Sequence, residues 1–337
     1  CEPGSIRFNT DTANLEYFRG KTLGWSQFEL VTPNLGGGTG SNTGLGIRGL
    51  FAGGFISPTG TARTNIIDFI TISTLGNAQD FGDRTHVSDT CAGAASKTRG
   101  VIAGGYAGSE TNVIEFVTIS SLGDALDFGD LPSNRRNRDG CGDTVRGLFG
   151  GGYPQSAQID YITFESLGNA IDFGDLTQTR YNSGALSSST RAVFAGGNAS
   201  PTSPNSNVID FVTIRTTGNA TDFGDLIGTM GTGGFSGTSN STRGLIGIAD
   251  SNSIEFITIA TTGNAQDFGD ATYNLGSHAA AGSPTRAVFA GGGASPAPLT
   301  NSMDFVEILT TGNGLDFGDL TDGRQSLAGF SNGHGGL

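Results

Sequence analysis

A short acidic and aromatic phrase occurs six times in this chain, and it constrains the fold more than any other feature. Its copies are TLGNAQDFGD from Thr74, SLGDALDFGDL from Ser121, SLGNAIDFGDL from Ser166, TTGNATDFGDL from Thr216, TTGNAQDFGD from Thr261 and TTGNGLDFGDL from Thr310. A period of 20 to 50 residues is the pattern of a repeat architecture, in which one structural unit is used many times. We therefore expect six equivalent modules.

Each copy of the phrase closes a unit that holds two apolar segments. The first segment opens with an arginine, and these arginines stand 43 to 52 residues apart, at Arg48, Arg99, Arg146, Arg191, Arg243 and Arg286. The second segment carries one central acid, at Asp68, Glu115, Asp160, Asp210, Glu255 and Asp304. In VIDFVTI from Val208 both alternating sets of residues are largely apolar, which is typical of a strand covered on both faces. With a glycine-rich segment before the arginine, each unit is expected to form the four short strands of a propeller blade.

The first unit lacks a glycine-rich strand before Arg48, and the missing copy, RQSLAGFSNG from Arg324, stands at the end of the chain. An unpaired strand edge is a liability, and a C-terminal strand that completes the first blade would remove it. We therefore predict an all-β, six-bladed β-propeller with four-stranded blades over residues 48–337, closed by its C-terminal strand. An N-terminal β-rich segment over 1–35 and a glycine-rich linker over 36–47 are expected to precede it.

Composition excludes several classes of function. The net charge is −13 and only two lysines occur, Lys21 and Lys97, so a basic face for nucleic acid is not expected. No apolar run reaches the roughly 18 residues of a membrane span, and no signal peptide is visible. The sequence opens on Cys1, which suggests a processed product or a fragment, with a lipidated N-terminus as an alternative. Cys91 and Cys141 are expected to be small buried residues rather than a bridge or a metal site.

The chain resembles the kelch-type propeller family in the Gly-Gly doublet that closes its second strand. The doublets are Gly53-Gly54, Gly104-Gly105, Gly151-Gly152, Gly196-Gly197 and Gly291-Gly292. Kelch blades usually carry a Tyr and a Trp after the doublet, whereas the only tryptophan here is Trp25, and repeat five lacks the doublet. The longer phrase GNAxDFGDL, and the N-terminal GSIRFNT…NLEYF, resemble segments of bacteriophage tail-fibre and structural proteins, particularly those of phages of marine bacteria and cyanobacteria. This resemblance implies a virion protein.

The repeated phrase allows a metal-binding and a structural interpretation. A calcium site needs about six oxygen ligands, and each phrase offers only two closely spaced carboxylates, such as Asp222 and Asp225. We favour the structural interpretation, in which Gly-Asn forms a tight turn, Phe223 anchors the outer strand between blades and Asp225 stabilises the following turn. The phrase is then a joint between modules.

The central acids of the third strands also allow two interpretations. An unpaired buried carboxylate is costly, so we infer a ring of ion pairs between these acids and the strand-opening arginines. The functional alternative is a pair of carboxylates that cleaves glycosides, which needs two acids about 5–10 Å apart in one cleft. His86, His278 and His334 show no ligand spacing. No catalytic residue, metal or cofactor is therefore predicted.

The loops between the second and third strands vary most among the repeats. Repeat one inserts FISPTGTARTNII and repeat three only YPQSAQI, and the loops are expected on the same face as the connections between blades. Tyr106, Tyr153 and Asn198 begin three of these loops and are the candidate ligand-binding residues. The tyrosines could stack on a sugar, or they could pack within the doublet turn.

We expect a non-enzymatic phage virion protein, a tail-fibre or surface-fibre module located on the virion, outside the cell. Its partners would be other virion proteins, further copies of itself in a homo-oligomer, and a host-surface glycan or receptor that the variable loops contact. The alternative is an extracellular or cell-surface adhesion propeller of a bacterium. A weaker alternative is a polysaccharide-degrading enzyme on the same scaffold.

Overall fold

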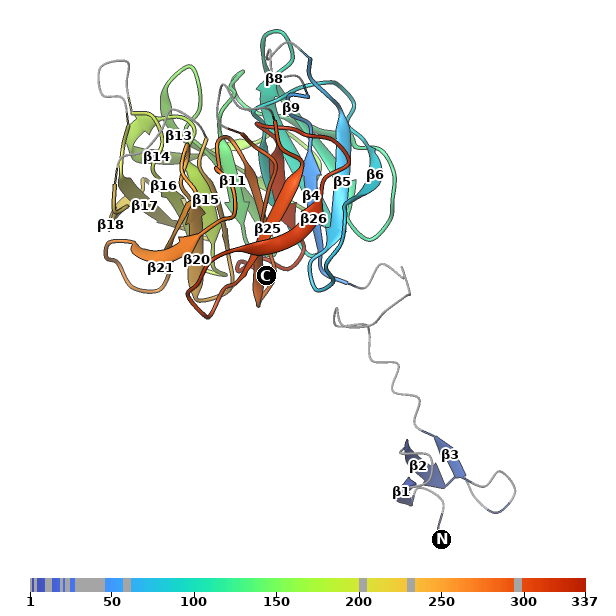
Figure 1. Ribbon diagram of the computed structural model, residues 1–337. Coiled ribbons are helices and arrows are strands. Elements are labelled where there is room, and N and C mark those ends of the chain that lie inside the picture. Colours follow the sequence, from blue (N-terminus) through green and yellow to red (C-terminus); the bar gives the residue numbers. More distant parts are fainter. Residues whose placement is uncertain are drawn as a thin grey trace.

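The computed structural model describes residues 2, 5–9, 14–18, 21, 25–27, 46–56, 62–199, 205–228, 234–293 and 299–337. Six four-stranded antiparallel sheets form a closed ring of blades (Figure 1). This confirms the all-β, six-bladed propeller that the repeat predicts. Within the described ranges no helix is long and apolar enough to cross a membrane.

Every blade follows the same strand order, from the channel at the centre of the ring to its outer rim. Blade 1 consists of β27 (Ala328–Ser331), β4 (Arg48–Ala52), β5 (Ile66–Thr71) and β6 (Gln79–Asp83). Blade 2 consists of β7 (Ala92–Ala95), β8 (Arg99–Tyr106), β9 (Glu110–Thr118) and β10 (Leu126–Asp130). Blade 3 consists of β11 (Asp139–Gly142), β12 (Arg146–Gly150), β13 (Ser156–Thr163) and β14 (Ile171–Arg180). Blade 4 consists of β15 (Gly184–Ser187), β16 (Arg191–Ala195), β17 (Val208–Thr213) and β18 (Thr221–Asp225). Blade 5 consists of β19 (Ser236–Ser239), β20 (Arg243–Gly247), β21 (Ser253–Thr258) and β22 (Gln266–Asp270). Blade 6 consists of β23 (Ala279–Gly282), β24 (Arg286–Ala290), β25 (Ser302–Glu307) and β26 (Leu315–Asp319).

A separate three-stranded sheet precedes the ring, in the order β1 (Ile6–Asn9), β2 (Asn14–Phe18) and β3 (Trp25–Gln27). The predicted linker over 36–47 lies outside the described residues except for Gly46 and Ile47.

The ring is closed by its last strand, as predicted. β27 pairs with β4 in antiparallel register, Ala328 opposite Ala52 and Phe330 opposite Leu50. Phe330 is buried in the cluster between blades 1 and 2. The chain's C-terminal end therefore joins its first blade directly.

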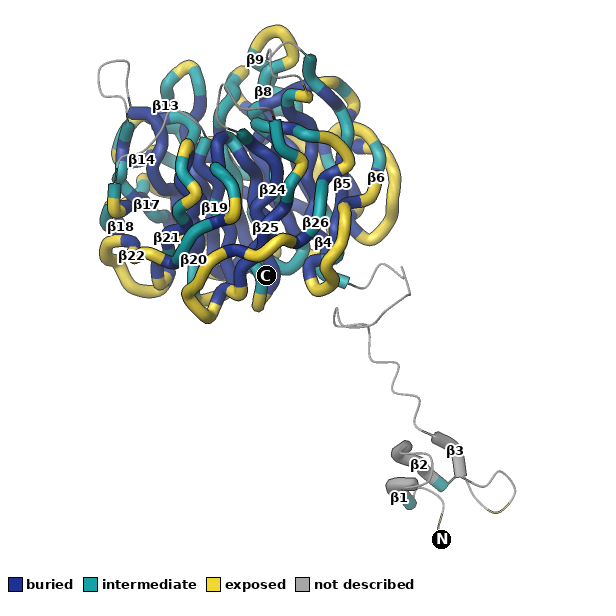
Figure 2. The backbone as a smooth tube through the Cα atoms, viewed as in Figure 1, coloured by how far each residue is buried: buried dark blue, intermediate teal, exposed yellow. Residues whose placement is uncertain are grey.

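The hydrophobic core lies between blades rather than inside one. One cluster, for example, joins Leu186, Val193 and Ile209 of blade 4 to Ile246 and Ile257 of blade 5. Since each blade is covered by two neighbours, both faces of its middle strands are buried, which explains their weak polar alternation. Figure 2 shows this as buried strands inside a rim of exposed turns.

The repeated phrase forms the joint between neighbouring blades. Gly218 N–H donates to Phe173 O at 2.8 Å, Ala220 N–H donates to Asp175 O at 2.7 Å, and Asp175 N–H donates to Asn219 Oδ1 at 3.1 Å. The same three bonds recur at every blade boundary, including the one between blades 6 and 1. Each hairpin thus pairs with the free edge of the preceding outer strand, which protects an edge that would otherwise be open to aggregation. The interpretation of the phrase as a joint between modules is confirmed. Asp225 takes part in the joint through its backbone, since its carbonyl accepts from Ala265 N–H and its N–H donates to Asn264 Oδ1.

The joint predicts unequal costs for two glycine substitutions. Gly224 and Gly263 have φ of 147° and 154°, but a Cβ on Gly224 would lie 2.5 Å from Gly263 O, whereas one on Gly263 meets open space. Gly263→Ala should cost about 1–3 kcal/mol through backbone strain alone. Gly224→Ala should cost about 1–3 kcal/mol more, because it also overpacks the joint. Urea unfolding measures the loss of stability in each variant. Equal losses would contradict the close approach of Gly224 to the Gly263 carbonyl.

The strand-opening arginines do not pair with the central acids of the third strands, so that part of the prediction is wrong. Arg191 lies opposite Thr213 in the strand register, whereas Asp210 lies opposite Phe194. Three residues along a strand separate the two side chains by about 10 Å. The Arg191 guanidinium instead stacks over the Phe211 ring, 4.5 Å from its centroid, and donates to Ile259 O of the next blade at 2.9 Å.

Four of the acids receive an arginine from the end of the preceding outer strand or from the connection between blades instead. The pairs are Arg324–Asp68 at 2.6 Å, Arg84–Glu115 at 2.7 Å, Arg138–Asp160 at 2.7 Å and Arg180–Asp210 at 2.8 Å. Although burial opposes ionisation of Glu115, hydrogen bonds from His86 and Thr85 and the Arg84 charge lower its pKa to about 2. In the described part of blades 5 and 6, Glu255 and Asp304 have no arginine partner, and burial raises both pKa values.

Candidate functional site

The ring has two faces, which we call the loop face and the tail face. First strands run from the loop face to the tail face, so the loop face carries both the second-to-third-strand loops and the connections between blades. The prediction that these two sets of loops lie on the same face is confirmed. The tail face carries the repeated hairpins and the C-terminal residues 332–337, and Figure 1 places the C-terminus on the side away from the β8–β9 hairpin.

The three predicted ligand-binding residues lie at equivalent places on the loop face. In each case the residue after a glycine doublet pairs with the residue that precedes a first strand by three positions: Tyr106 with Asp89, Tyr153 with Arg136, and Asn198 with Tyr181. The doublet glycines permit this turn, with φ of 67° and 102° at Gly196 and Gly197. The structure therefore brings all three residues to one rim around the channel.

Arginine and aromatic side chains alternate along this rim over blades 1 to 4. We call this set the ladder, and its members in order are Phe55, Arg63, Tyr106, Arg136, Tyr153 and Tyr181. The Arg63 guanidinium lies 5.1 Å from the Phe55 centroid and 4.6 Å from the Tyr106 centroid. The Arg136 guanidinium lies 4.6 Å from the Tyr106 centroid and 4.9 Å from the Tyr153 centroid. Stacking of this kind fixes the ring orientations.

Carboxylates balance the two ladder arginines. Arg63 pairs with Asp89, which is buried, and Arg136 lies 3.5 Å from Glu110. Burial raises the pKa of Asp89, although Arg63 and Arg136 act against that shift. The ladder is therefore close to neutral in charge.

Asn198 differs from the two tyrosines because its amide is already engaged. It is buried, its Nδ2 donates to Asn205 Oδ1 at 2.9 Å, and its Oδ1 accepts from Asn182 Nδ2 at 3.1 Å. Its geometry suits it to fixing the start of the loop beside Tyr181. Arg63, Arg136 and Tyr181 were not among the predicted residues, and the only signal for them is that the repeats differ at their positions.

The mouth of the central channel lies inside this rim. Five blades place a residue with positive φ there, namely Thr90, Asn137, Asn182, Ser277 and Ser326. Their backbones are linked in sequence, for example Asn137 N–H to Thr90 O and Asn182 N–H to Asn137 O, both at 2.9 Å. A cavity of about 80 Å³ lies within this ring.

Asp139 lines that cavity and was not among the residues predicted to form a site. Its carboxylate accepts hydrogen bonds from Gly140 N–H at 2.8 Å and Ala185 N–H at 2.7 Å. Burial nevertheless raises its pKa to about 8. The first residue of the other inner strands is Ala, Gly or Ser, and this contrast is the only sequence signal.

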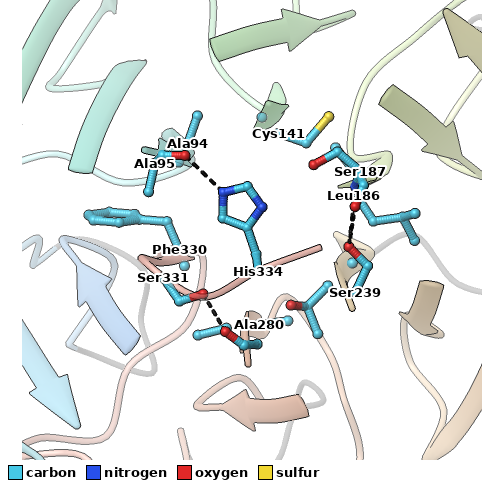
Figure 3. A pocket seen from close by; sticks show the side chains of 18 residues that line it. Ala94, Ala95, Cys141, Leu186, Ser187, Ser239, Ala280, Phe330, Ser331 and His334 are labelled. Carbon is cyan, nitrogen blue, oxygen red and sulfur yellow. Dashed lines mark hydrogen bonds between the residues drawn. The ribbon is translucent and has the colours of Figure 1, made fainter. Parts of the chain in front are cut away.

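The C-terminal tail closes the other end of the channel (Figure 3). His334 Nε2–H donates to Ala95 O at 2.8 Å, and His334 Nδ1 accepts from Gly336 N–H at 3.1 Å. The contact at Nδ1 requires a neutral imidazole protonated on Nε2, and burial lowers the pKa of His334. The space that remains is about 30 Å³ and is lined mainly by small residues.

Within the part of the chain that the structure describes, no three His, Cys, Asp or Glu side chains are placed to hold a metal ion. Cys91 and Cys141 are free and buried, as the sequence indicated. No protein-family model matches the chain, and no curated protein matches it.

Proposed function

We propose that this chain is a non-enzymatic recognition module of a bacteriophage fibre, which presents its loop face to the host surface. The observation that carries the proposal is the broken symmetry of that face. The joints and the core repeat around the ring, whereas the rim holds the ladder in blades 1 to 4 and glycines, such as Gly276 and Gly293, in blade 6. A rigid scaffold with one variable face is a common design for binding.

The position of the chain ends supports an outward-facing loop face. Ile47 leads into blade 1 on the tail face, where its carbonyl accepts from Ile72 N–H at 3.0 Å and Gly333 lies against it. Whatever precedes residue 46 therefore joins the ring opposite the ladder. The repeated phrase GNAxDFGDL and the fibre-like N-terminal segment are the sequence features that favour a virion setting.

The environment of the third-strand acids supports a binding role over glycoside hydrolysis. Each of these acids is held by groups of its own or the preceding blade, as Asp210 is by Arg180 and by the Thr177 N–H and hydroxyl. A general acid and its partner must be free to reach substrate. The acids are instead enclosed between blades, with Asp68, Glu115, Asp160 and Asp210 fully buried.

Loop shortening tests the proposal. The loops of repeats one, four and six, which lie partly outside the described residues, would be cut to the length found in repeat three. The melting temperature should barely change, because surface loops tolerate changes of length. Attachment of the labelled protein, or of phage carrying it, to host cells should fall.

Two results would contradict the proposal. Unchanged attachment by the shortened protein would exclude the loop face as the recognition surface. Release of reducing ends from host polysaccharide would indicate an enzyme. Phage structural genes beside the coding sequence would separate the fibre from a bacterial adhesion propeller, which would use the same face.

A further inference from the structure

We propose that the ladder binds an uncharged polysaccharide, with the chain lying along blades 1 to 4. This inference rests on the proposed role of the loop face and specifies its ligand. It is carried by three properties of the ladder: its free hydroxyl groups, its charge balance and its elongated outline.

The ladder offers hydroxyl groups on fixed aromatic rings. Tyr106, Tyr153 and Tyr181 are each partly exposed, and within the described part of the chain no hydrogen bond involves their phenol oxygens. Their rings are held by Arg63 and Arg136, and Tyr181 meets Tyr153 edge to face with centroids 5.6 Å apart. A tyrosine that is already oriented loses little conformational entropy on binding.

The charge balance favours an uncharged ligand. Each ladder arginine already faces a carboxylate, Asp89 or Glu110, so no unpaired cation remains to attract a polyanion. The chain as a whole carries a net charge of −13, which repels anionic polymers. Paired guanidinium groups still have N–H donors for neutral hydroxyl oxygens.

The outline of the ladder favours a long ligand over a compact one. Among the described residues Tyr181 is the last aromatic member of the ladder, and blade 6 has glycines at the equivalent pair of positions, Gly276 and Gly293. The ladder is therefore an arc over part of the rim and not a closed cup. Several weak contacts along one polymer chain together give a higher affinity than any one of them alone.

Affinity electrophoresis tests the inference in gels that contain dextran, galactomannan or mixed-linkage β-glucan, with alginate as the anionic comparison. At least one uncharged polymer should retard the wild-type protein, and alginate should not. Tyr106→Phe with Tyr153→Phe should weaken that retardation on the order of tenfold, because two hydrogen bonds are lost while both rings remain.

Tyr161→Phe is the matched control, because Tyr161 occupies a position that holds Phe in the other five blades and lies within the blade beside Phe173. It should leave retardation unchanged. The inference would be overturned if alginate alone retarded the wild-type protein, or if no polymer did. It would also be overturned if the double variant were retarded as strongly as the wild-type protein. Host attachment that protease treatment of the cells abolishes would also overturn it while leaving the fibre role intact. Failure of the fibre role would appear separately, as absence of attachment to any host.

Discussion

Removal of residues 321–337 is expected to abolish the folded monomer. The deletion takes away β27, which pairs with β4, and Phe330, which is buried between blades 1 and 2. It also removes Arg324 from buried Asp68, and a buried charge without its partner is costly. The opened ring would expose an apolar blade face and an unpaired edge, so aggregation should follow. Size-exclusion chromatography and thermal melting followed by circular dichroism measure the outcome.

A shorter deletion, of residues 334–337, is the control for this experiment. It removes His334 and the tail that plugs the channel but leaves β27 complete. This variant should stay monomeric with a modest loss of stability. If the longer deletion also remained monomeric with an unchanged melting curve, closure by the last strand would not be what holds the ring together.

Features that depend on local pattern were predictable from the sequence. The strands follow from apolar runs of the right length, and the strand count itself indicated that Arg324–Gly333 completes blade 1. The repeated phrase was recognisable as a joint because each copy offers too few oxygen ligands for a calcium site, whereas its Gly-Asn pair suits a tight turn. Its detailed action was not predictable, since Asn219 acts on Asp175 of the preceding blade rather than only within its own turn.

The buried ion pairs show why contacts between blades were not predictable. Arg180 and Arg324 stand four residues before their first strands, whereas Arg84 stands eight before and Arg138 one before. All four nevertheless reach the equivalent acid. Because different chain positions supply the same cation, no fixed spacing marks it. The strand-opening arginines stand at the same place in every blade, the first residue of the second strand, but they have a different role.

The ladder was partly predictable for a related reason. Tyr106 and Tyr153 follow glycine doublets, so their place on a loop could be expected from the repeat. Arg63 and Arg136 come from two different connecting segments, and only the closed ring brings them onto the tyrosines. Their role depends on packing among three blades, which a single repeat does not encode.

Asp210→Ala is expected to lower the free energy of unfolding by about 3–5 kcal/mol. Arg180 is fully buried against Asp210 at 2.8 Å, so the variant would leave a guanidinium without its counter-charge. Burial already lowers the pKa of Arg180, and Asp210 acts against that shift. Asp304→Ala is the matched control in blade 6, where no arginine lies beside the acid among the described residues. It should cost less, about 1–3 kcal/mol for lost hydrogen bonds.

Blade 6 also shows how the arginine could be replaced. Arg180 donates to Val208 O at 2.8 Å and Phe194 O at 3.0 Å, and in blade 6 the Tyr273 hydroxyl lies 3.0 and 3.1 Å from the corresponding oxygens of Ser302 and Phe289. The position of Arg180 is then occupied by buried Leu275. In sequence, Tyr273 and Leu275 correspond to Gln178 and Arg180.

Transplanting this arrangement into blade 4 should therefore rescue the loss of the arginine. Arg180→Leu alone should lower the free energy of unfolding by about 3–5 kcal/mol. It leaves the buried Asp210 carboxylate without its counter-charge and two carbonyl groups without their donors. Adding Gln178→Tyr supplies a hydroxyl donor to those carbonyls and should recover about half of that loss, while Asp210 keeps its bonds from Thr177 and becomes easier to protonate. Urea unfolding of the two variants at pH 7 measures the difference. Equal stability of the single and double variants would show that the arginine acts on Asp210 alone, and that satisfying the carbonyl groups contributes nothing to the blade.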